Sequence, residues 1–246
     1  MTMDILLLRL EGPLISFGAP IVDQIGAIQE FPGLSMVAGL LANALGYDHR
    51  DFAKTQALQD RLEFACRRDR DGMKLTDYHT VDLGQEHLVD TGWTTWGRCE
   101  ERGKGAATSG THIRLRDYWA DSAFTLALAL AGGVAPPGLD GISAALERPA
   151  RPLFLGRKCC LPSVPLLLGR IQCPSLLLAL RSAPDLSPGR RQPGRTRHAC
   201  WPFAEGAHGT ACREVRVTDA RDWRNQIQTG ERRMYQGLIE LEAAIV

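Results

Sequence analysis

The order of strand-like and helix-like segments along residues 4–155 constrains the fold of this 246-residue chain more than any other feature. A two-residue alternation of apolar and polar positions indicates a strand, and apolar residues at i, i+3 and i+4 indicate a helix. The pattern predicts the order strand, helix, strand, strand, helix, strand, which specifies an α+β fold with a ferredoxin-like topology. The predicted segments are Asp4–Leu10 (strand), Phe31–Gly46 (helix, with Ser35 as a possible N-cap), Phe52–Cys66 (a second helix, or a helix and a strand), Leu75–Asp82, Thr111–Trp119 and Ser122–Ala131 (strands), Gly138–Leu146 (helix) and Pro152–Leu155 (strand).

Two domains are expected. The ferredoxin-like topology also serves RNA-recognition modules, so we predict an RRM-like RNA-binding domain over residues 1–165, with Gly12 and Pro13 ending its first strand. The pattern weakens after residue 165, and short segments there predict a smaller β-rich domain over residues 166–246. In that second domain we expect a strand at Leu176–Leu180 and further short elements at Val215–Val217 and Glu231–Ile239.

A polar, glycine-rich stretch from about Leu83 to Gly110 interrupts the first predicted domain. Loops longer than about 12–15 residues in compact domains are usually functional or disordered. Basic residues interleaved with aromatic ones suit stacking against unpaired nucleotides, and the aromatic rings equally suit anchoring to a neighbouring protein. The residues concerned are Trp93, Trp96, Arg98, Arg102 and Lys104.

The overall charge gives no signal for nucleic acid, because the formal net charge at pH 7 is only +1. The type of cation is more informative, since 25 of the 29 cationic residues are arginines. A guanidinium pairs with phosphate oxygens through two parallel hydrogen bonds, which an ammonium cannot do. The arginine bias therefore agrees with phosphate recognition, and a GC-rich genome would produce the same bias.

The cysteines and the apolar segments indicate the compartment. The chain has seven cysteines, an odd number, and no secretory signal precedes them. We therefore expect a cytoplasmic protein with reduced thiols. The longest apolar stretch, Phe124–Ala135, is too short to span a bilayer, so no membrane partner is expected.

One set of potential zinc ligands occurs near the C-terminus. His198, Cys200, His208 and Cys212 are suitable in type, but their spacing lacks the paired Cys-x-x-Cys of typical zinc sites. We predict no metal and no cofactor. A zinc-stabilised nucleic-acid module is kept as an alternative class that metal analysis would test.

The pair Arg157-Lys158, directly after Gly156, is the strongest candidate for contact with a phosphate backbone. The glycine permits close backbone approach, and the two cations follow an apolar strand-like segment. The alternative is a solvated strand end. Arg114 and Arg116 alternate with apolar residues, so both lie on one strand face, which contacts either RNA or water.

His79 is the natural candidate for a general base, because histidine titrates near neutral pH and RNA cleavage needs such a group near a 2′-hydroxyl. With Tyr78 and a cation such as Lys158 it would form a metal-independent endoribonuclease site. A lone histidine in a strand is more often structural. The chain has no carboxylate cluster, no Walker loop and no Gly-x-Ser-x-Gly elbow, so we favour a non-catalytic protein.

Four motifs, in the same order, resemble the CRISPR-associated Cas-five family, and most closely its type I-E form. They cover almost the whole chain and are weakest over residues 182–212. The motifs are Leu7-Leu8-Arg9-Leu10-Glu11-Gly12-Pro13 with Ser16-Phe17-Gly18, Phe31-Pro32 with Ser35, Asp77-Tyr78-His79-Thr80-Val81, and Phe154-Leu155-Gly156-Arg157-Lys158.

The resemblance implies a ferredoxin-like domain with an inserted β-hairpin thumb at about residues 83–110, followed by a smaller β-rich domain. It also implies a non-catalytic subunit of a type I CRISPR interference (Cascade) complex for antiviral defence, which caps the 5′ handle of the crRNA. The implied partners are that handle, the filament backbone subunit, the large subunit and target DNA within the assembled complex. Type I-C relatives cut repeat RNA themselves, which keeps the endoribonuclease alternative open.

The start of the first helix departs from the family pattern. Family members often carry Thr and a cation where this chain has Gly33 and Leu34. A phosphate could still bind the backbone amides at the N-terminus of this helix. The predicted RNA-binding set is Ser35, Arg98, Arg102, Lys104, Arg114, Arg116, Arg157 and Lys158.

Overall fold

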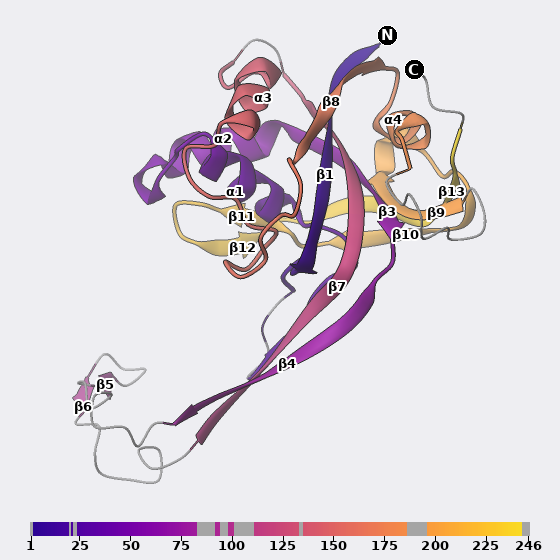
Figure 1. The fold of residues 1–246 in the computed structure, drawn as a ribbon. Helices are drawn as coiled ribbons and strands as arrows, with labels where there is room; N and C mark the ends of the chain where they lie inside the picture. Colours follow the sequence, from indigo (N-terminus) through magenta and orange to yellow (C-terminus); the bar gives the residue numbers. More distant parts are fainter. Residues whose placement is uncertain are drawn as a thin grey trace.

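One large antiparallel sheet organises the chain (Figure 1). The computed structural model describes residues 2–19, 21, 24–82, 92–93, 98–100, 111–132, 135–185 and 196–242. The sheet order is β10-β13-β9-β3-β7-β1-β8, and β4 and β2 add to β7, β2 in parallel. These strands are β1 (Met3–Ile15), β2 (Ile25–Gly26), β3 (Leu62–Arg70), β4 (Met73–Asp82), β7 (Thr111–Leu130), β8 (Leu167–Cys173), β9 (Thr196–Pro202), β10 (Thr210–Val217) and β13 (Arg232–Glu240).

Four α-helices accompany the sheet in the described part of the chain: α1 (Leu34–Ala44), α2 (Phe52–Arg61), α3 (Leu139–Glu147) and α4 (Leu176–Ser182). The mixed α and β class predicted from the sequence is confirmed. Phe52–Cys66 divides into α2 and the start of β3, which is the second of the two predicted possibilities. No helix among the described residues has the length and apolar character needed to cross a bilayer.

β1 and β7 are both longer than predicted. β1 continues through Gly12 and Pro13 to Ile15, because β8 pairs only as far as Leu8 and leaves that edge of β1 without a strand where the proline lies. The predicted division into two strands, Thr111–Trp119 and Ser122–Ala131, is also wrong, since β7 is one strand. Its pairing with β1 continues on both sides of Asp121, although the φ of Asp121 is +55°.

Pro152–Leu155 is not a strand; the strand that follows α3 is β8. The backbone of Leu155 is occupied locally, because its N–H donates to the Cys160 carbonyl (2.7 Å) and its carbonyl accepts from Ser16 N–H (2.9 Å). β8 pairs with β1, and β9 pairs with β3. The same sheet therefore includes strands from both sides of residue 165.

Leu176–Leu180 belongs to α4 and not to a strand. A short apolar run has no periodicity that distinguishes a strand from a buried helix. The helix start is fixed by Ser175, whose hydroxyl accepts from Leu178 N–H, and by Glu205, whose carboxylate accepts from the N–H groups of Leu176 and Leu177 (2.8 Å each).

The central strands of the sheet are buried on both faces, which explains why β1 is continuously apolar from Ile5 to Leu8. Leu6, Leu8 and Leu10 point to one face and pack with α1 and α3, whereas Ile5 and Leu7 point to the other and pack with α4. In a strand, successive side chains alternate between faces. A run of consecutive leucines is therefore needed here, because both faces are covered.

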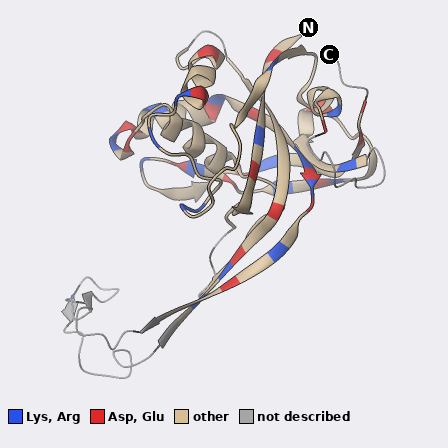
Figure 2. Cartoon of the chain, in the orientation of Figure 1, with Lys and Arg blue, Asp and Glu red and all other residues tan. Residues whose placement is uncertain are grey.

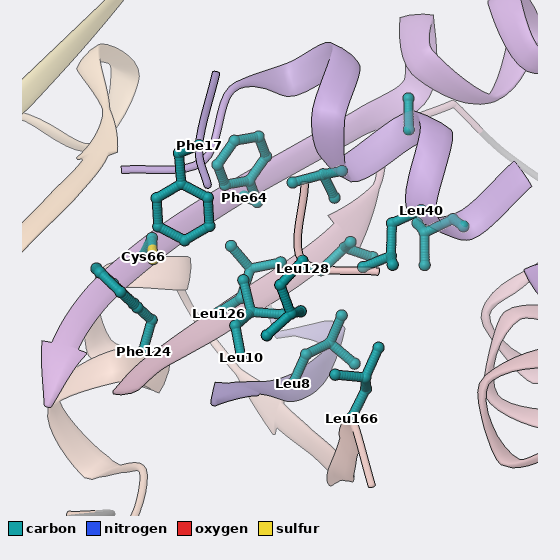
Figure 3. Packing of buried hydrophobic residues seen from close by; sticks show 14 of the residues in the cluster. Leu8, Leu10, Phe17, Leu40, Phe64, Cys66, Phe124, Leu126, Leu128 and Leu166 are labelled. Carbon is teal, nitrogen blue, oxygen red and sulfur yellow. The ribbon is translucent and has the colours of Figure 1, made fainter. Parts of the chain in front are cut away.

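β3 and β7 present side chains of different size to the two faces. Large side chains such as Phe64 and Phe124 fill the face beneath α1 (Figure 3). On the α4 face, β3 and β7 present Ala65, Ala127 and Ala129. Small residues permit close approach, so the short α4 packs directly on the sheet.

The remaining described elements are small. The 3-10 helices are η1 (His49–Asp51) and η4 (Phe203–Glu205), and β11 (Ala220–Asp222) pairs with β12 (Ile227–Thr229). Within the predicted thumb, β5 (Gly92–Trp93) pairs with β6 (Cys99–Glu100). β4 and the first half of β7 lead toward this segment as a two-stranded arm (Figure 1).

Candidate nucleic-acid interface

A cleft of about 730 Å³ opens beside the start of α1. Four stretches of chain supply most of its lining: Ser16–Ala19, α1 from Gly33 to Asn43, the turn Phe154–Lys158 and the β10–β11 junction. The structure thus brings together three predicted site residues that are far apart in sequence: Ser35, Arg157 and Lys158.

The start of α1 differs from the prediction. The N-cap is Gly33, and Ser35 lies inside the helix without a capping hydrogen bond from its side chain. The cap comes from Asp219, whose Oδ2 accepts from Leu34 N–H (2.8 Å) and whose carbonyl accepts from Ser35 N–H (2.9 Å). Sequence inspection missed this residue, because a single aspartate 185 positions away carries no local capping signal.

Asp219 changes what the helix N-terminus can bind. Its carboxylate is buried, and Arg232 holds it through Nε (2.8 Å) and Nη2 (2.6 Å). The amides of Leu34 and Ser35 are therefore occupied by two oxygens of Asp219, its carboxylate and its backbone carbonyl. A phosphate at these two amides would have to displace Asp219, so the Ser35 hydroxyl is the part of the predicted contact that stays in the proposal.

The turn before Lys158 is held tightly to the body of the protein. Gly156 has φ +103°, and a Cβ there would lie 1.8 Å from the Ser16 carbonyl oxygen. The glycine is thus required, but by close approach to the protein's own backbone. The Arg157 guanidinium donates to the carbonyls of Asp117 (Nη1, 2.7 Å) and Gly26 (Nη2, 2.9 Å). Lys158 next to it is exposed.

Aromatic and thiol groups surround this turn. The Arg157 guanidinium lies 4.7 Å from the centre of the Tyr118 ring, and the Tyr118 hydroxyl is 3.6 Å from Cys159 Sγ. Burial raises the pKa of Tyr118, and the contact with Cys159 adds to the shift. Burial also raises the pKa of Cys160 to about 12. Both groups are neutral at physiological pH, so arginine and lysine provide the charge here.

Two residues that line the cleft, Ser16 and Arg221, each have a buried side-chain atom (Oγ and Nε) without a hydrogen-bond partner in the described part of the molecule. The Ser16 side chain is 1% exposed, and its Oγ has no hydrogen bond within the described part of the molecule. Gln29, His49 and Gln228 also line the cleft. Hydroxyl, amide and imidazole groups beside apolar walls are suited to hydrogen-bonding a polar ligand edge.

The remaining predicted cations lie elsewhere. Arg114 and Arg116 are half-buried on β7, opposite His79 and Asp77 of β4. Arg98 is exposed. Arg102 and Lys104 lie outside the described residues, as do Trp96 and most of the predicted thumb.

The residues of the predicted catalytic alternative come from two segments, β4 and the Phe154–Lys158 turn. Tyr78 and His79 are consecutive on β4, so their side chains point to opposite faces of the arm. His79 Nε2 lies 2.5 Å from Asp77 Oδ2, and both residues are exposed. Lys158 lines the cleft on a separate segment.

The four potential zinc ligands also lie in different environments. Cys200 is buried opposite Cys66 on the neighbouring strand, and burial raises the pKa of its thiol to about 12. His208 Nε2 lies 2.8 Å from the Glu205 carbonyl. Among the residues whose positions are described, no three His, Cys, Asp or Glu side chains gather as a metal site.

Positive and negative side chains are interspersed over the described part of the chain, as Figure 2 shows. This mixture agrees with the net charge of +1.

Comparisons of this chain with protein families and with individual proteins agree with each other. The family described as "CRISPR-associated protein (Cas_Cas5)" matches residues 5–235. The CRISPR system Cascade subunit CasD of Escherichia coli (strain K12) is 32% identical over 175 residues, covering 68% of this chain and 71% of that protein.

Two solved structures share the fold. A chain described as "CRISPR RNA-guided surveillance complex" superimposes with a TM-score of 0.65 at 23% identity, covering 96% of this chain and 90% of that one. A chain described as "Crystal structure of Cas protein" has a TM-score of 0.63 at 26% identity, covering 98% and 97%.

Proposed function

This chain belongs to the CRISPR-associated Cas5 family, and from that premise we propose that it is the Cascade subunit that binds and caps the 5′ handle of the crRNA. The resemblance to CasD supports membership of a Cascade complex. The cleft beside α1 is the proposed RNA contact, with Lys158 as its exposed cation and the Ser35 hydroxyl at its wall. The filament backbone subunit, the large subunit and target DNA are the proposed further partners.

The arrangement of strands supports a ferredoxin-like core. β8, β1, β7 and β3 are consecutive and antiparallel in the sheet. α1 and α2 connect β1 to β3, and α3 connects β7 to β8. This is the strand order expected of the split βαβ unit. The β4–β7 arm leads into residues 83–110, the proposed thumb, where Arg98, Arg102 and Lys104 are proposed to reach the guide or an adjacent subunit.

One observation carries the proposal: the cleft joins motifs from both halves of the family signature. The segments around Ser16 and Ser35 come from the N-terminal motifs, and Lys158 comes from the fourth motif. Residues scattered over more than 140 positions meet at one surface, with a cation at the rim and polar groups inside. Single-stranded RNA is recognised by such combinations of backbone and base-edge contacts.

Binding to RNA is tested with the purified chain and a fluorescein-labelled single-stranded RNA that carries the repeat-derived 5′ handle from the protein's own array. Counterion release makes log K fall linearly with log salt, by about 0.7 per phosphate contact on a single strand. Lys158→Ala is expected to weaken binding and to reduce this slope by about 0.7. Arg148→Ala is the matched control, because Arg148 is exposed and does not line the cleft. An equal effect of both variants, or no binding by the unchanged chain, contradicts the proposal.

Cleavage of repeat RNA is tested separately, because type I-C relatives provide the alternative. We expect the purified protein to leave labelled repeat hairpin intact with or without EDTA, since Tyr78 and His79 point to opposite faces of β4. Specific cleavage that disappears in His79→Ala would establish the endoribonuclease instead.

A further inference from the structure

We propose that Arg157 is a positioning residue that holds the turn presenting Lys158, and that it does not itself neutralise an RNA phosphate. The inference rests on the proposed function and deepens it. Sequence inspection treats the two neighbouring cations as equivalent phosphate ligands. Their surroundings in the structure differ, and this difference assigns them separate roles.

The guanidinium of Arg157 is already committed on three sides. Two of its nitrogen atoms donate to backbone carbonyls on different strands, Asp117 of β7 and Gly26 of β2. Its guanidinium carbon lies over the Tyr118 ring, 4.7 Å from the ring centre. The residue is half-buried, whereas Lys158 is exposed and makes no described hydrogen bond or ion pair. A guanidinium that donates to two carbonyls has fewer N–H groups available for a phosphate.

The hydrogen bonds of Arg157 tie the turn to the sheet. Cys160 N–H donates to the Arg157 carbonyl (2.9 Å), and Leu155 N–H donates to the Cys160 carbonyl (2.7 Å), which closes the turn. Ser16 N–H donates to the Leu155 carbonyl (2.9 Å). The side chain of Arg157 then fastens this closed turn to β2 and β7. Without it, the segment carrying Lys158 would keep its backbone link to Ser16, the contact of Cys159 with Tyr118 and the buried side chains of Leu155 and Cys160, but would lose both hydrogen bonds to β2 and β7.

Gly26 offers a way to disturb the same contact from the other side. A Cβ at this position would lie 2.9 Å from Arg157 Nη2, and 3.4 Å from both Arg116 Cδ and the Leu115 carbonyl oxygen. Gly26→Ala therefore disturbs the guanidinium without removing any cation. It separates the loss of the contact from the loss of charge, which no substitution of Arg157 by a neutral residue can do.

The conservative variant discriminates between the two roles. Lysine keeps the charge at position 157, but an ammonium cannot bridge both carbonyls while stacking on the ring. As a positioning residue, Arg157 is not replaceable by lysine. We expect Arg157→Lys, Arg157→Ala and Gly26→Ala each to weaken RNA binding by about tenfold, the loss of one or two hydrogen bonds to a charged group. Their salt slopes should equal that of the unchanged chain.

The experiment uses the full chain and the labelled handle RNA described above, titrated at several salt concentrations. Lys158→Ala serves as the reference for a lost phosphate contact, with its slope reduced by about 0.7. If Arg157→Lys binds like the unchanged chain while Arg157→Ala loses affinity and slope, Arg157 contacts phosphate and the inference is overturned. Unchanged affinity in all three variants overturns it as well.

A measurement without RNA tests the clamp itself, that is, the two hydrogen bonds by which Arg157 holds the turn to β2 and β7. Hydrogen–deuterium exchange of the peptide that contains Cys160 should be at least about tenfold faster in Arg157→Lys and Gly26→Ala, because the turn opens more often. Slow exchange in both variants refutes the clamp, whatever the result of the RNA titration. Faster exchange with no RNA binding by the unchanged chain would instead refute the proposed function and leave the clamp standing.

Discussion

Substitution of Asp219 should strongly affect the stability of this protein, because its carboxylate connects the β10–β11 junction to both α1 and β13. Asp219 caps α1 through Leu34 and pairs with Arg232 of β13, and its side chain is 6% exposed. Asp219→Ala removes a helix cap, worth about 1 kcal/mol. It also leaves Arg232 unpaired at 23% exposure. Breaking a fully buried pair costs about 3–5 kcal/mol, and partial access to water reduces this to about 2 kcal/mol.

Together these losses predict that Asp219→Ala destabilises the protein by about 3 kcal/mol, or roughly 6–12 °C in melting temperature for a chain of this size. Asp219→Asn keeps an acceptor for Leu34 and should lose less, about 2 kcal/mol. Urea unfolding followed by circular dichroism measures the difference, provided that the slope with denaturant is unchanged.

Asp48→Ala is the matched control. Asp48 also caps a helical turn, accepting from Arg50 N–H at 2.6 Å, but on the exposed surface. Its loss should not exceed about 1 kcal/mol. If Asp219→Ala costs no more than Asp48→Ala, the long-range cap and its ion pair are not a major source of stability and the argument fails.

Three further variants test other parts of the structure by chemical unfolding. Lys74→Met removes a hydrogen bond that, together with one from a neighbouring threonine, lowers the pKa of Asp117 below 3.8 in the folded protein. A carboxyl group whose pKa is lowered on folding stabilises the protein at pH values above its unfolded pKa. The variant should therefore lose about 0.5 kcal/mol of unfolding free energy at pH 7, and nothing once the pH has fallen through the folded pKa. A loss that grows on acidification would contradict this. Arg67→Met breaks a fully buried pair with an aspartate and leaves three carbonyls around the end of α4 without a donor, so it should cost about 3–5 kcal/mol, and a near-neutral result would refute it. Gly156→Ala should cost more than about 2 kcal/mol of stability, because the φ of Gly156 is positive and a Cβ would overlap a backbone carbonyl. Gly18→Ala is the control: a Cβ there has nothing within 4 Å, so stability should change by less than about 0.5 kcal/mol. Equal costs for the two variants would contradict the steric argument.

Local patterns were sufficient for much of the first half of the fold. The helical spacing before Gly46 predicted α1, and the glycine closes it as expected with φ +81°. Tyr47 N–H donates to the Ala42 carbonyl and Gly46 N–H to the Asn43 carbonyl, a Schellman arrangement that glycine makes possible. These features depend only on neighbours in sequence, which is why the sequence could predict them.

The second half was less predictable because distant residues decide it. Leu176–Leu180 has no periodicity of its own, and it becomes a helix because Glu205 accepts from its first amides and Ala65 and Ala127 leave room for it on the sheet. The same holds for Pro152–Leu155, whose backbone groups are taken by a local turn and by Ser16.

The sequence by itself determined the α+β class, the positions of β1, α1, β4 and α3, and the family to which the chain belongs, because these follow from periodicity, turn residues and motif order. Tertiary structure alone decided that Asp219 occupies the helix N-terminus proposed for phosphate, and that Arg157 is bound by two carbonyls while Lys158 remains exposed. The two cations are adjacent and chemically alike in sequence. Only the strands folded against one of them distinguish a side chain held by the protein from one available to a ligand.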